Sequence, residues 1–328
     1  MKRLFGRLRG AAAKKGFRCY FTTDIHGSER CFRKFLAAAR VYECDALILG
    51  GDVAGKAIVP MTDLGSGRTS MVYDGALRTL SGDELEAAIA NLRAAGMYPR
   101  YCTDEERQRL TDDVDYRERL FAEVIVEQLQ GWCALAAERL DPDLPCIITP
   151  GNDDPLEIDD KLRQDPRVQF PERELLEVGP ITLASLGNTN PTPWNTAREF
   201  SEEELGTQID QLLGPAPGDA RLVLNFHCPP YASGLDTATK LDGDLRPVME
   251  GGRPVDVPVG STAVRAAIER YRPVVGLHGH IHESAGTWRS GGTVCLNPGS
   301  EYGSGVLKGA LVQFDEEGNY QSHLLTTG

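Results

Sequence analysis

Short apolar runs alternate along the chain with segments whose apolar residues recur at helical spacing. Apolar runs of four to seven residues bounded by turn residues are typical of buried strands. They predict strands at residues 17–23, 46–49, 145–149, 175–178, 181–186, 221–226, 274–277, 293–296, 310–314 and 320–325. The helical spacing predicts helices at residues 28–40, 81–96, 103–139, 156–162, 202–213 and 261–271. This alternation is typical of the α/β class, and the last three strands are expected to close a second sheet.

Residues 56–141 interrupt the pattern and are predicted to form an insertion. Two short β-type runs on either side of a Gly-Ser-Gly turn predict a hairpin. Capping-box spacing at Ser81 and at Thr103 marks the starts of two helices, the second of which is expected to bend near Gly131. Residues 81–141 hold fourteen acidic and seven basic residues. We expect this mostly helical insertion to pack its apolar face on the main domain, or on a second copy of the chain in a homo-oligomer.

A chain of 328 residues can form one large domain or two small ones, and with 41% hydrophobic and 25% charged residues it has the composition of a globular protein. We expect one main domain at residues 17–328. Residues 1–16 are predicted to be a basic, flexible tail, or a segment that contacts a membrane surface or a partner. Seven Lys or Arg and no acid occur in residues 1–18, so the rest of the chain stands at −20 within a net charge of −13. This acidic balance argues against a long nucleic acid as a partner.

Cysteine usage and hydropathy give an expectation about location. The eight cysteines form no CxxC pair, and several lie in apolar strand-like runs, which favours a reducing cytoplasm. No run of about 18 apolar residues occurs, so no stable membrane insertion is expected.

Ligand-type residues follow five of the predicted strands. The clusters are Asp24-Ile25-His26, Gly50-Gly51-Asp52, Gly151-Asn152-Asp153, His227, and His278-Gly279-His280-Ile281-His282. In open α/β sheets, sites form at the carboxyl ends of strands. Because alternate residues of an extended segment share a face, Asp24 with His26, and His278 with His280, are expected to converge. Carboxylates, one amide and imidazoles together suit Mn, Fe, Zn, Ni or Co better than calcium, and the lack of thiolate argues against structural zinc.

These motifs resemble those of the calcineurin-like metallophosphoesterase family, from Asp24 to His280, and leave out only the tail and the insertion. The loop GNTNPTPWNT at residues 187–196, and the pairing of HGHIHES with NPGSEYG, resemble an Icc-like, predicted-phosphodiesterase branch. The resemblance implies a four-layer α-β-β-α sandwich of two mixed β-sheets flanked by helices.

The resemblance also implies a binuclear centre of two divalent metal ions, with manganese favoured. The implied ligands are Asp24, His26, Asp52 and His280 for one ion, and Asp52, Asn152, His227 and His278 for the other. The implied reaction is hydrolysis of a phosphate ester by a metal-bound hydroxide. Independently of the resemblance, two divalent ions and two carboxylates leave a positive charge, which suits an anionic ester.

One position departs from the family pattern. Much of the family has a histidine, thought to protonate the leaving group, where this chain has Asp153. An aspartate beside two cations has a depressed pKa and is a poor acid, so Asp153 has either a direct catalytic part or a structural one. His282 is a candidate proton donor, or else a supporting or structural histidine.

The departure at Asp153 favours a phosphodiesterase that acts on a small phosphorylated compound or nucleotide. The alternatives are a phosphomonoesterase, a nuclease on short single strands, and a non-catalytic scaffold that keeps this fold to bind proteins.

Candidate substrate-binding residues lie in the loop at 187–196. They are Asn188, Asn190, Trp194 and Asn195, with Trp194 expected to stack on a base or else to pack in a rigid turn. Asn297 and Ser300 are expected to support the histidine loop by hydrogen bonds. The loop at 228–259 and the acidic insertion are expected to control access, which favours a small phosphate ester as the substrate.

Overall fold

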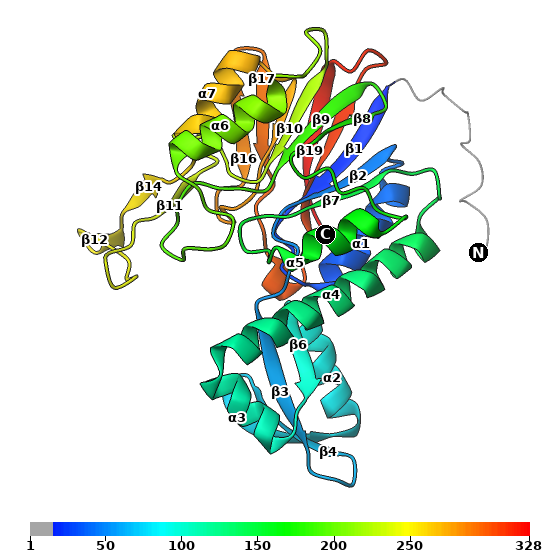
Figure 1. Cartoon of the computed structure of the whole chain (residues 1–328), viewed down its shortest axis with the longest axis vertical. Helices are drawn as coiled ribbons and strands as arrows, with labels where there is room; N and C mark the ends of the chain where they lie inside the picture. The colour runs from blue at the N-terminus through cyan, green and yellow to red at the C-terminus, as the bar shows by residue number, and fades with distance from the viewer. Residues whose placement is uncertain (1–15) are drawn as a thin grey trace, which may run out of the picture.

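In a computed structural model of the protein, two β-sheets pack face to face between helices (Figure 1). The structure describes residues 16–328, so the predicted basic tail at residues 1–16 lies outside the described residues except for Gly16.

The first sheet contains five strands in the order β19-β18-β1-β2-β7. Its strands are β1 Phe17–Thr22, β2 Ala46–Gly50, β7 Cys146–Thr149, β18 Lys308–Phe314 and β19 Tyr320–Thr327. The strands β1, β2 and β7 are parallel, and β18 pairs antiparallel with β1, with Phe17 opposite Phe314. The prediction that residues 310–314 and 320–325 close the second sheet is therefore wrong. An apolar run marks a strand but not its partner, and these two strands extend the free edge of β1.

The second sheet contains six strands in the order β16-β17-β15-β10-β9-β8. Its strands are β8 Leu175–Val178, β9 Ile181–Leu186, β10 Leu222–Phe226, β15 Val275–Leu277, β16 Gly286–Ser290 and β17 Thr293–Asn297. The strands β9, β10, β15 and β17 are parallel, while β8 and β16 pair antiparallel at the two edges. The sequence did not predict β16, because Gly, Thr, Arg and Ser occupy four of its five positions.

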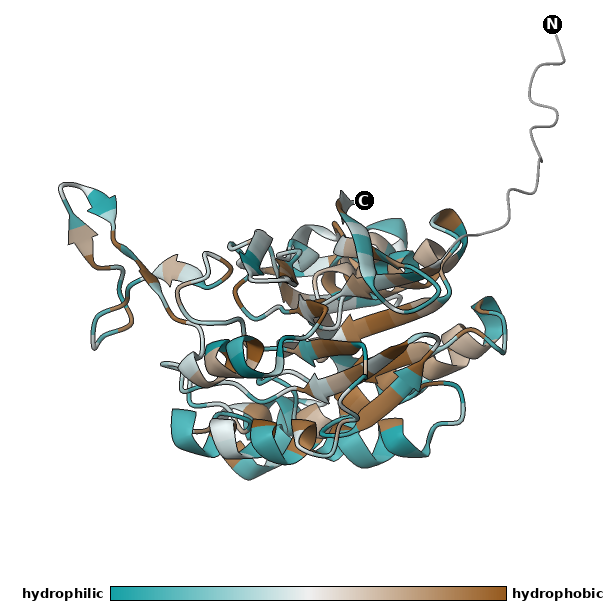
Figure 2. Ribbon diagram, turned by 90° about the horizontal axis from the view of Figure 1, so that it is seen from above, coloured by the Kyte–Doolittle hydropathy of each residue, from teal (hydrophilic) through white to brown (hydrophobic). Residues whose placement is uncertain are grey.

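Alternate side chains of the two sheets meet in a central apolar core. Phe21 and Ile48 of the first sheet and Leu183, Val223 and Leu277 of the second sheet belong to this core. Opposite faces of the sheets pack on helices, which completes the predicted α-β-β-α sandwich. The helices are α1 Glu29–Val41, α4 Val114–Arg139 and α5 Glu157–Gln164 on the first sheet, and α6 Glu202–Leu213 and α7 Thr262–Tyr271 on the second. Figure 2 shows the apolar strands enclosed by these layers.

The insertion contains a four-stranded sheet in the order β5-β4-β3-β6. Its elements are β3 Ala57–Asp63, β4 Arg68–Tyr73, β5 Ala76–Ser81, α2 Gly82–Ala94, β6 Met97–Tyr101 and α3 Asp104–Asp112. The predicted hairpin is β3 with β4, but β5 and β6 were not predicted. Helix α4 continues without a break through Gly131, where the sequence predicts a bend. The helical segment breaks at Asp113 instead, whose side chain accepts from the Tyr116 N–H and caps α4.

Helix α4 joins the insertion to the main body. The ring of Trp132 stacks on Phe32 of α1, with centroids 4.2 Å apart and planes within 5°. Leu129 and Ala136 of α4 are buried in the same core as Phe32. The apolar face of the insertion therefore packs on the rest of the chain through this helix.

The long loop at residues 228–259 forms a projecting ribbon, which we define as residues 237–258 (Figures 1 and 2). It contains the short strands β11 Thr237–Thr239, β12 Met249–Glu250, β13 Arg253–Pro254 and β14 Asp256–Pro258, which pair as β11 with β14 and β12 with β13. None of the helices within residues 16–328 has both the length and the apolar character needed to cross a bilayer.

Candidate metal centre

The segments that follow β1 and β2 run side by side toward one end of the sandwich. The Asp24 N–H donates to the Gly51 carbonyl at 3.0 Å, and the His26 N–H donates to the Asp52 carbonyl at 2.9 Å. The segments after β10 and β15 are linked in the same way, because the Gly279 N–H donates to the His227 carbonyl at 3.0 Å. Ligand-type residues from both sheets are thereby held at one location, as predicted from the carboxyl ends of the strands.

Left-handed backbone conformations aim several of these side chains. Asp24, His26, Asp52 and His280 have φ angles of 52°, 39°, 50° and 67°. Each such conformation costs a residue with a side chain about 1 kcal/mol, and strain of this kind is concentrated at functional sites. The expectation that Asp24 and His26 converge through an extended segment is therefore wrong, although the two side chains do meet.

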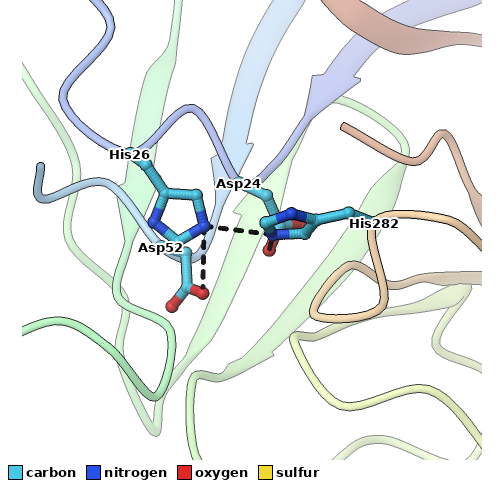
Figure 3. Close-up of side chains that lie close together, drawn as sticks. All are labelled: Asp24, His26, Asp52 and His282. Atoms are coloured by element: carbon cyan, nitrogen blue, oxygen red, sulfur yellow. Dashed lines mark hydrogen bonds and ion pairs between the residues drawn. The ribbon is translucent and has the colours of Figure 1, made fainter. Parts of the chain in front are cut away.

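A first group of possible ligands consists of Asp24, His26, Asp52 and His282, whose ligand atoms all lie within 4.8 Å of one another. Figure 3 shows His26 between the Asp52 carboxylate and the ring of His282. The His26 Nε2 atom lies 3.6 Å from Asp52 Oδ2 and 3.1 Å from His282 Nε2. The His282 Nε2 atom lies 3.3 Å from Asp24 Oδ1.

A second group consists of Asp52, His227 and His280, again within 4.8 Å. The His227 Nε2 atom lies 3.3 Å from Asp52 Oδ1 and 3.8 Å from Asp24 Oδ1. Asp52 belongs to both groups, so its carboxylate lies between two possible metal positions.

The histidines of the fifth cluster, residues 278–282, are shifted by two residues relative to the expectation. His282 takes the place expected for His280 in the first group, and His280 takes the place expected for His278 in the second. His278 is in neither group and faces the interior, with its Nδ1 atom 2.8 Å from the Phe226 carbonyl and 3.1 Å from that of Cys228. Three histidines at identical spacing fit two registers, and the sequence offers no signal that separates them.

Buried polar atoms without partners test whether these residues suit a cation. Among the described residues, His227 Nε2 and Asn152 Oδ1 are buried and have no hydrogen-bond partner. Asn152 lines the same cavity as Asp52 and directs its amide nitrogen to Thr196 Oγ1 at 3.0 Å, which leaves the oxygen available. An unsatisfied buried polar atom is costly, and a divalent ion would satisfy the Asn152 oxygen directly and the His227 nitrogen once that nitrogen has lost its proton. The residues therefore fit a metal site of nitrogen and oxygen ligands.

Charge in the site favours metal binding as well. Burial lowers the pKa of His26 to about 3 and that of His280 to about 4, so both imidazoles are neutral. Burial would raise the pKa of Asp24, but His227 and His282 outweigh it and hold the value at about 2. Burial would lower the pKa of His227, but Asp52 and Asp24 raise it to about 10. A bound ion would take the place of the His227 proton.

Two glycines allow the close approach of the ligand segments. A Cβ at Gly51, whose φ is 109°, would lie 2.1 Å from His227 Nδ1. A Cβ at Gly151 would lie 2.2 Å from Asp52 Oδ1. Both contacts are shorter than any side chain tolerates, so glycine is required at both positions.

Asp153 lies beside the ligands and is paired with Lys56. Its N–H donates to Asp52 Oδ1 at 3.0 Å, and its carboxylate forms an ion pair with the Lys56 ammonium. Burial and the charge of Asp52 raise the pKa of Asp153. The next residue, Asp154, accepts from the Val53, Ala54 and Gly151 N–H groups and ties the two loops together.

A cavity of about 840 Å³ opens from the ligand residues and extends to the ribbon. Among the candidate substrate-binding residues, only Trp194 lines it. Asn188 donates to Gln208, Asn190 donates to the Val259 carbonyl, and neither borders the cavity. Asn195 is exposed and also lies outside the lining, so three of the four candidates belong to the loop's own structure.

The histidine loop is supported as expected. The Asn297 side chain donates to the Ile281 carbonyl at 2.9 Å, and the Ser300 N–H donates to the His282 carbonyl at 3.1 Å. Ser300 Oγ also donates to the Asp24 carbonyl of the neighbouring segment at 2.6 Å. Sequence reasoning missed Lys56 and Tyr302, which also line the cavity. Lys56 carried only the weak signal of being the first residue of the insertion, and Tyr302 lies within the quoted NPGSEYG segment.

Comparison with known proteins gives a distant relative and a shared fold. No family model matches the chain. The uncharacterized protein MJ1162 of Methanocaldococcus jannaschii is 29% identical over 154 residues, which are 46% of this chain and 62% of that protein. The chain thus matches less than two thirds of the length of this relative.

Solved structures superpose over nearly the whole chain. One solved structure superposes with a TM-score of 0.53 at 15% sequence identity. The superposition covers 95% of this chain and 98% of the other chain. TT1561 of Thermus thermophilus gives a TM-score of 0.49 with the same identity and coverage. The 5'-nucleotidase precursor of the same organism gives 0.39 at 12% identity, with 95% of this chain and 54% of the other covered. The likeness at a TM-score of 0.53 shows a shared fold.

Proposed function

We propose that this protein is a calcineurin-like, binuclear metal-dependent phosphoester hydrolase, and that it is a phosphodiesterase for a small phosphorylated compound or nucleotide. The observation that carries the proposal is the position of Asp52, whose carboxylate is shared by two groups of buried ligand residues at one end of a large cavity. Shared carboxylates of this kind are typical of two-metal hydrolases.

The chain's own residues divide into two ligand sets. Asp24, His26, Asp52 and His282 would hold one divalent ion, and Asp52, Asn152, His227 and His280 would hold the other. Manganese is the ion we favour for these nitrogen and oxygen ligands. Two such ions would lower the pKa of a bound water and neutralise the charge that develops on a phosphate ester.

Three further residues orient the ligands or border the substrate. Ser300 and Asn297 fix the loops that carry Asp24 and His280. The His282 side chain is 32% exposed at the cavity, so it is the ligand residue most open to the substrate. Because His282 is placed among the ligands, it is not free to be the proton donor that the sequence suggested as one of its roles.

The cavity is large enough for a nucleotide, since ligand pockets measure about 300–1,000 Å³. Trp194 offers an aromatic face for the organic part of the ester. All eight cysteines are buried, and none forms a disulfide within residues 16–328, which supports the expected cytoplasmic location.

The test is hydrolysis of bis-p-nitrophenyl phosphate and p-nitrophenyl phosphate, with manganese and after chelation. Wild type is expected to cleave the diester faster, and Asp52→Asn to lose about a thousandfold in kcat/KM because it removes the shared ligand. The control is Asp74→Asn, which makes the same change at an exposed aspartate with the same φ of 50°, and which should leave the activity unchanged.

Faster cleavage of the monoester would replace the diesterase with a phosphomonoesterase. Absence of both metal binding and hydrolysis would contradict the proposal and leave the protein-binding scaffold.

A further inference from the structure

Lys56 is the first residue of the insertion and reaches into the cavity. Its backbone N–H donates to the Gly96 carbonyl at 3.0 Å, which fixes the point where the insertion leaves the main body. Its side chain is 35% exposed and lines the cavity beside Asp52 and Asn152. The insertion therefore contributes a cation next to the ligand residues.

Asp153 holds this cation in place. The Asp153 carboxylate binds the Lys56 ammonium and accepts from the Asn152 amide at 3.2 Å, while the Asp153 N–H is bound to Asp52. A carboxylate anchored in this way fixes the ammonium at a set position relative to the ligands. Among the described residues, Asp153 provides the one hydrogen bond to Lys56 Nζ. An ammonium has three N–H donors, so two remain for a molecule in the cavity.

The second lysine that lines the cavity, Lys240, is not held near the ligand residues as Lys56 is. Lys240 is exposed and belongs to the projecting ribbon, whereas Lys56 is held at the metal end of the cavity. A phosphate ester at that end presents anionic oxygens, for which charge-assisted hydrogen bonds from an ammonium are strong partners.

We infer that Lys56 is a substrate-binding residue whose ammonium, positioned by Asp153, donates hydrogen bonds to a phosphate oxygen of the ester. The inference rests on the proposed function and deepens it, because it makes the insertion part of the phosphate-binding site. The competing explanation is that Lys56 only neutralises the buried charge of Asp153.

Binding of inorganic phosphate to the manganese-loaded full-length protein separates these explanations. Calorimetry is expected to show about tenfold weaker phosphate binding for Lys56→Met, with bound manganese unchanged. Lys56→Arg should recover most of the affinity, because a guanidinium also donates to phosphate. The matched control is Lys240→Met, which removes the other lysine of the cavity and should bind phosphate as wild type does.

The double variant Lys56→Met with Asp153→Asn removes both charges of the pair together. If Lys56 only neutralises Asp153, the double variant should bind phosphate like the wild type, and this result would overturn the inference. Binding that stays about tenfold weak supports a direct contact. Loss of manganese in Lys56→Met would also overturn it, since Lys56 would then support the ligands.

The diester assay on the same samples keeps the two hypotheses apart. If the wild type hydrolyses the diester and Lys56→Met binds phosphate as tightly as the wild type, the role of Lys56 is overturned. The proposed hydrolase activity is then still supported. A KM that rises about tenfold for Lys56→Met while kcat falls less supports the contact. A wild type that binds neither manganese nor phosphate overturns both.

Discussion

The two ends of the cavity are built in different ways. At the metal end, Asp24 and His227 are each 1% exposed, lie just past the carboxyl ends of the buried strands β1 and β10, and have backbones fixed by hydrogen bonds between neighbouring segments. At the outer end, Trp194 is 65% exposed and faces a ribbon that projects from the body. The metal end is formed by the segments that follow the strands of the two sheets. The outer end is formed by the loop that carries Trp194 and by the ribbon.

Because of this difference, we expect the metal end to determine catalysis and the outer end to determine substrate preference. Groups that must keep fixed distances for catalysis are best held by rigid elements, and the strained conformations of Asp24 and Asp52 persist because the surrounding structure holds them. Loops are where selectivity is usually carried. We therefore expect substitutions at the metal end to abolish activity, and substitutions at the outer end to change which substrate is preferred.

The largest effect on activity is expected from substitution of one of two neighbouring histidines at the metal end, His280 but not His278. His280→Ala should lower kcat/KM about a thousandfold and reduce the bound metal, because His280 belongs to the second ligand group. His278→Ala should keep its metal but lower the free energy of unfolding by about 2 kcal/mol, because it removes a buried side chain and its bonds to two carbonyls.

Metal analysis by mass spectrometry and urea unfolding measure the two effects separately. If His278→Ala loses metal as His280→Ala does, the register expected from the sequence, in which both histidines are ligands, is the correct one.

An intermediate effect is expected at Glu172, where the sandwich meets the loop that carries Trp194. The Glu172 carboxylate accepts the Gly187 N–H, and burial raises its pKa from 4.5 to about 7. Between these two values the folded protein binds a proton that the unfolded chain releases, so stability falls as pH rises through this window. Glu172→Gln cannot ionise and therefore removes this loss of stability. Relative to the wild type, it should raise the free energy of unfolding by about 2 kcal/mol at pH 8 and change it little at pH 4.

Urea unfolding at several pH values checks this expectation. The control is Glu177→Gln on the neighbouring strand β8, which makes the same change at an exposed side chain. A difference between Glu172→Gln and wild type that stays constant from pH 4 to pH 8 would contradict the assigned burial effect.

The smallest effect is expected at the outer end. Trp194→Ala should raise KM for a nucleotide-like diester about tenfold, since stacking of a base on an aromatic ring contributes about 1–3 kcal/mol. Trp194→Phe should keep most of the affinity, and bound metal and kcat should be unchanged in both variants. Comparison of an aryl diester with a small alkyl diester checks the reason, because equal KM changes for both would exclude stacking.

The sequence allowed the fold class and most ligand residues to be predicted, because buried strands and their terminal motifs are encoded locally. Asp24, His26, Asp52 and His227 lie in the groups expected for them, whereas His280 lies in the other group. The exchange of His278 for His282 depends on how the chain turns after β15, where His280 adopts a left-handed conformation. No local pattern predicts that turn.

Other differences arise from tertiary pairing. Strands β18 and β19 were predicted as strands, but their membership of the first sheet depends on the free edge of β1. Strand β5 is exposed at most positions and carries no apolar alternation, so its pairing with β4 could not be seen. Lys56 and Asp153 form an ion pair although they are far apart in the sequence. Their opposite charges were not sufficient to predict that pair.

Helix α4 has a consequence for how this chain can be cut and recombined. The strands β2 and β7 are parallel neighbours, and parallel strands need a crossover between them. Helix α4 is that crossover, because its Leu129 and Trp132 cover the first sheet together with α1. Excision of the whole of 56–141 would therefore remove a wall of the sandwich, whereas excision of 57–112 would leave α4 in place and remove the contribution of Tyr98 to the core. A deletion that joins Lys56 to Asp113 through a short linker keeps the crossover.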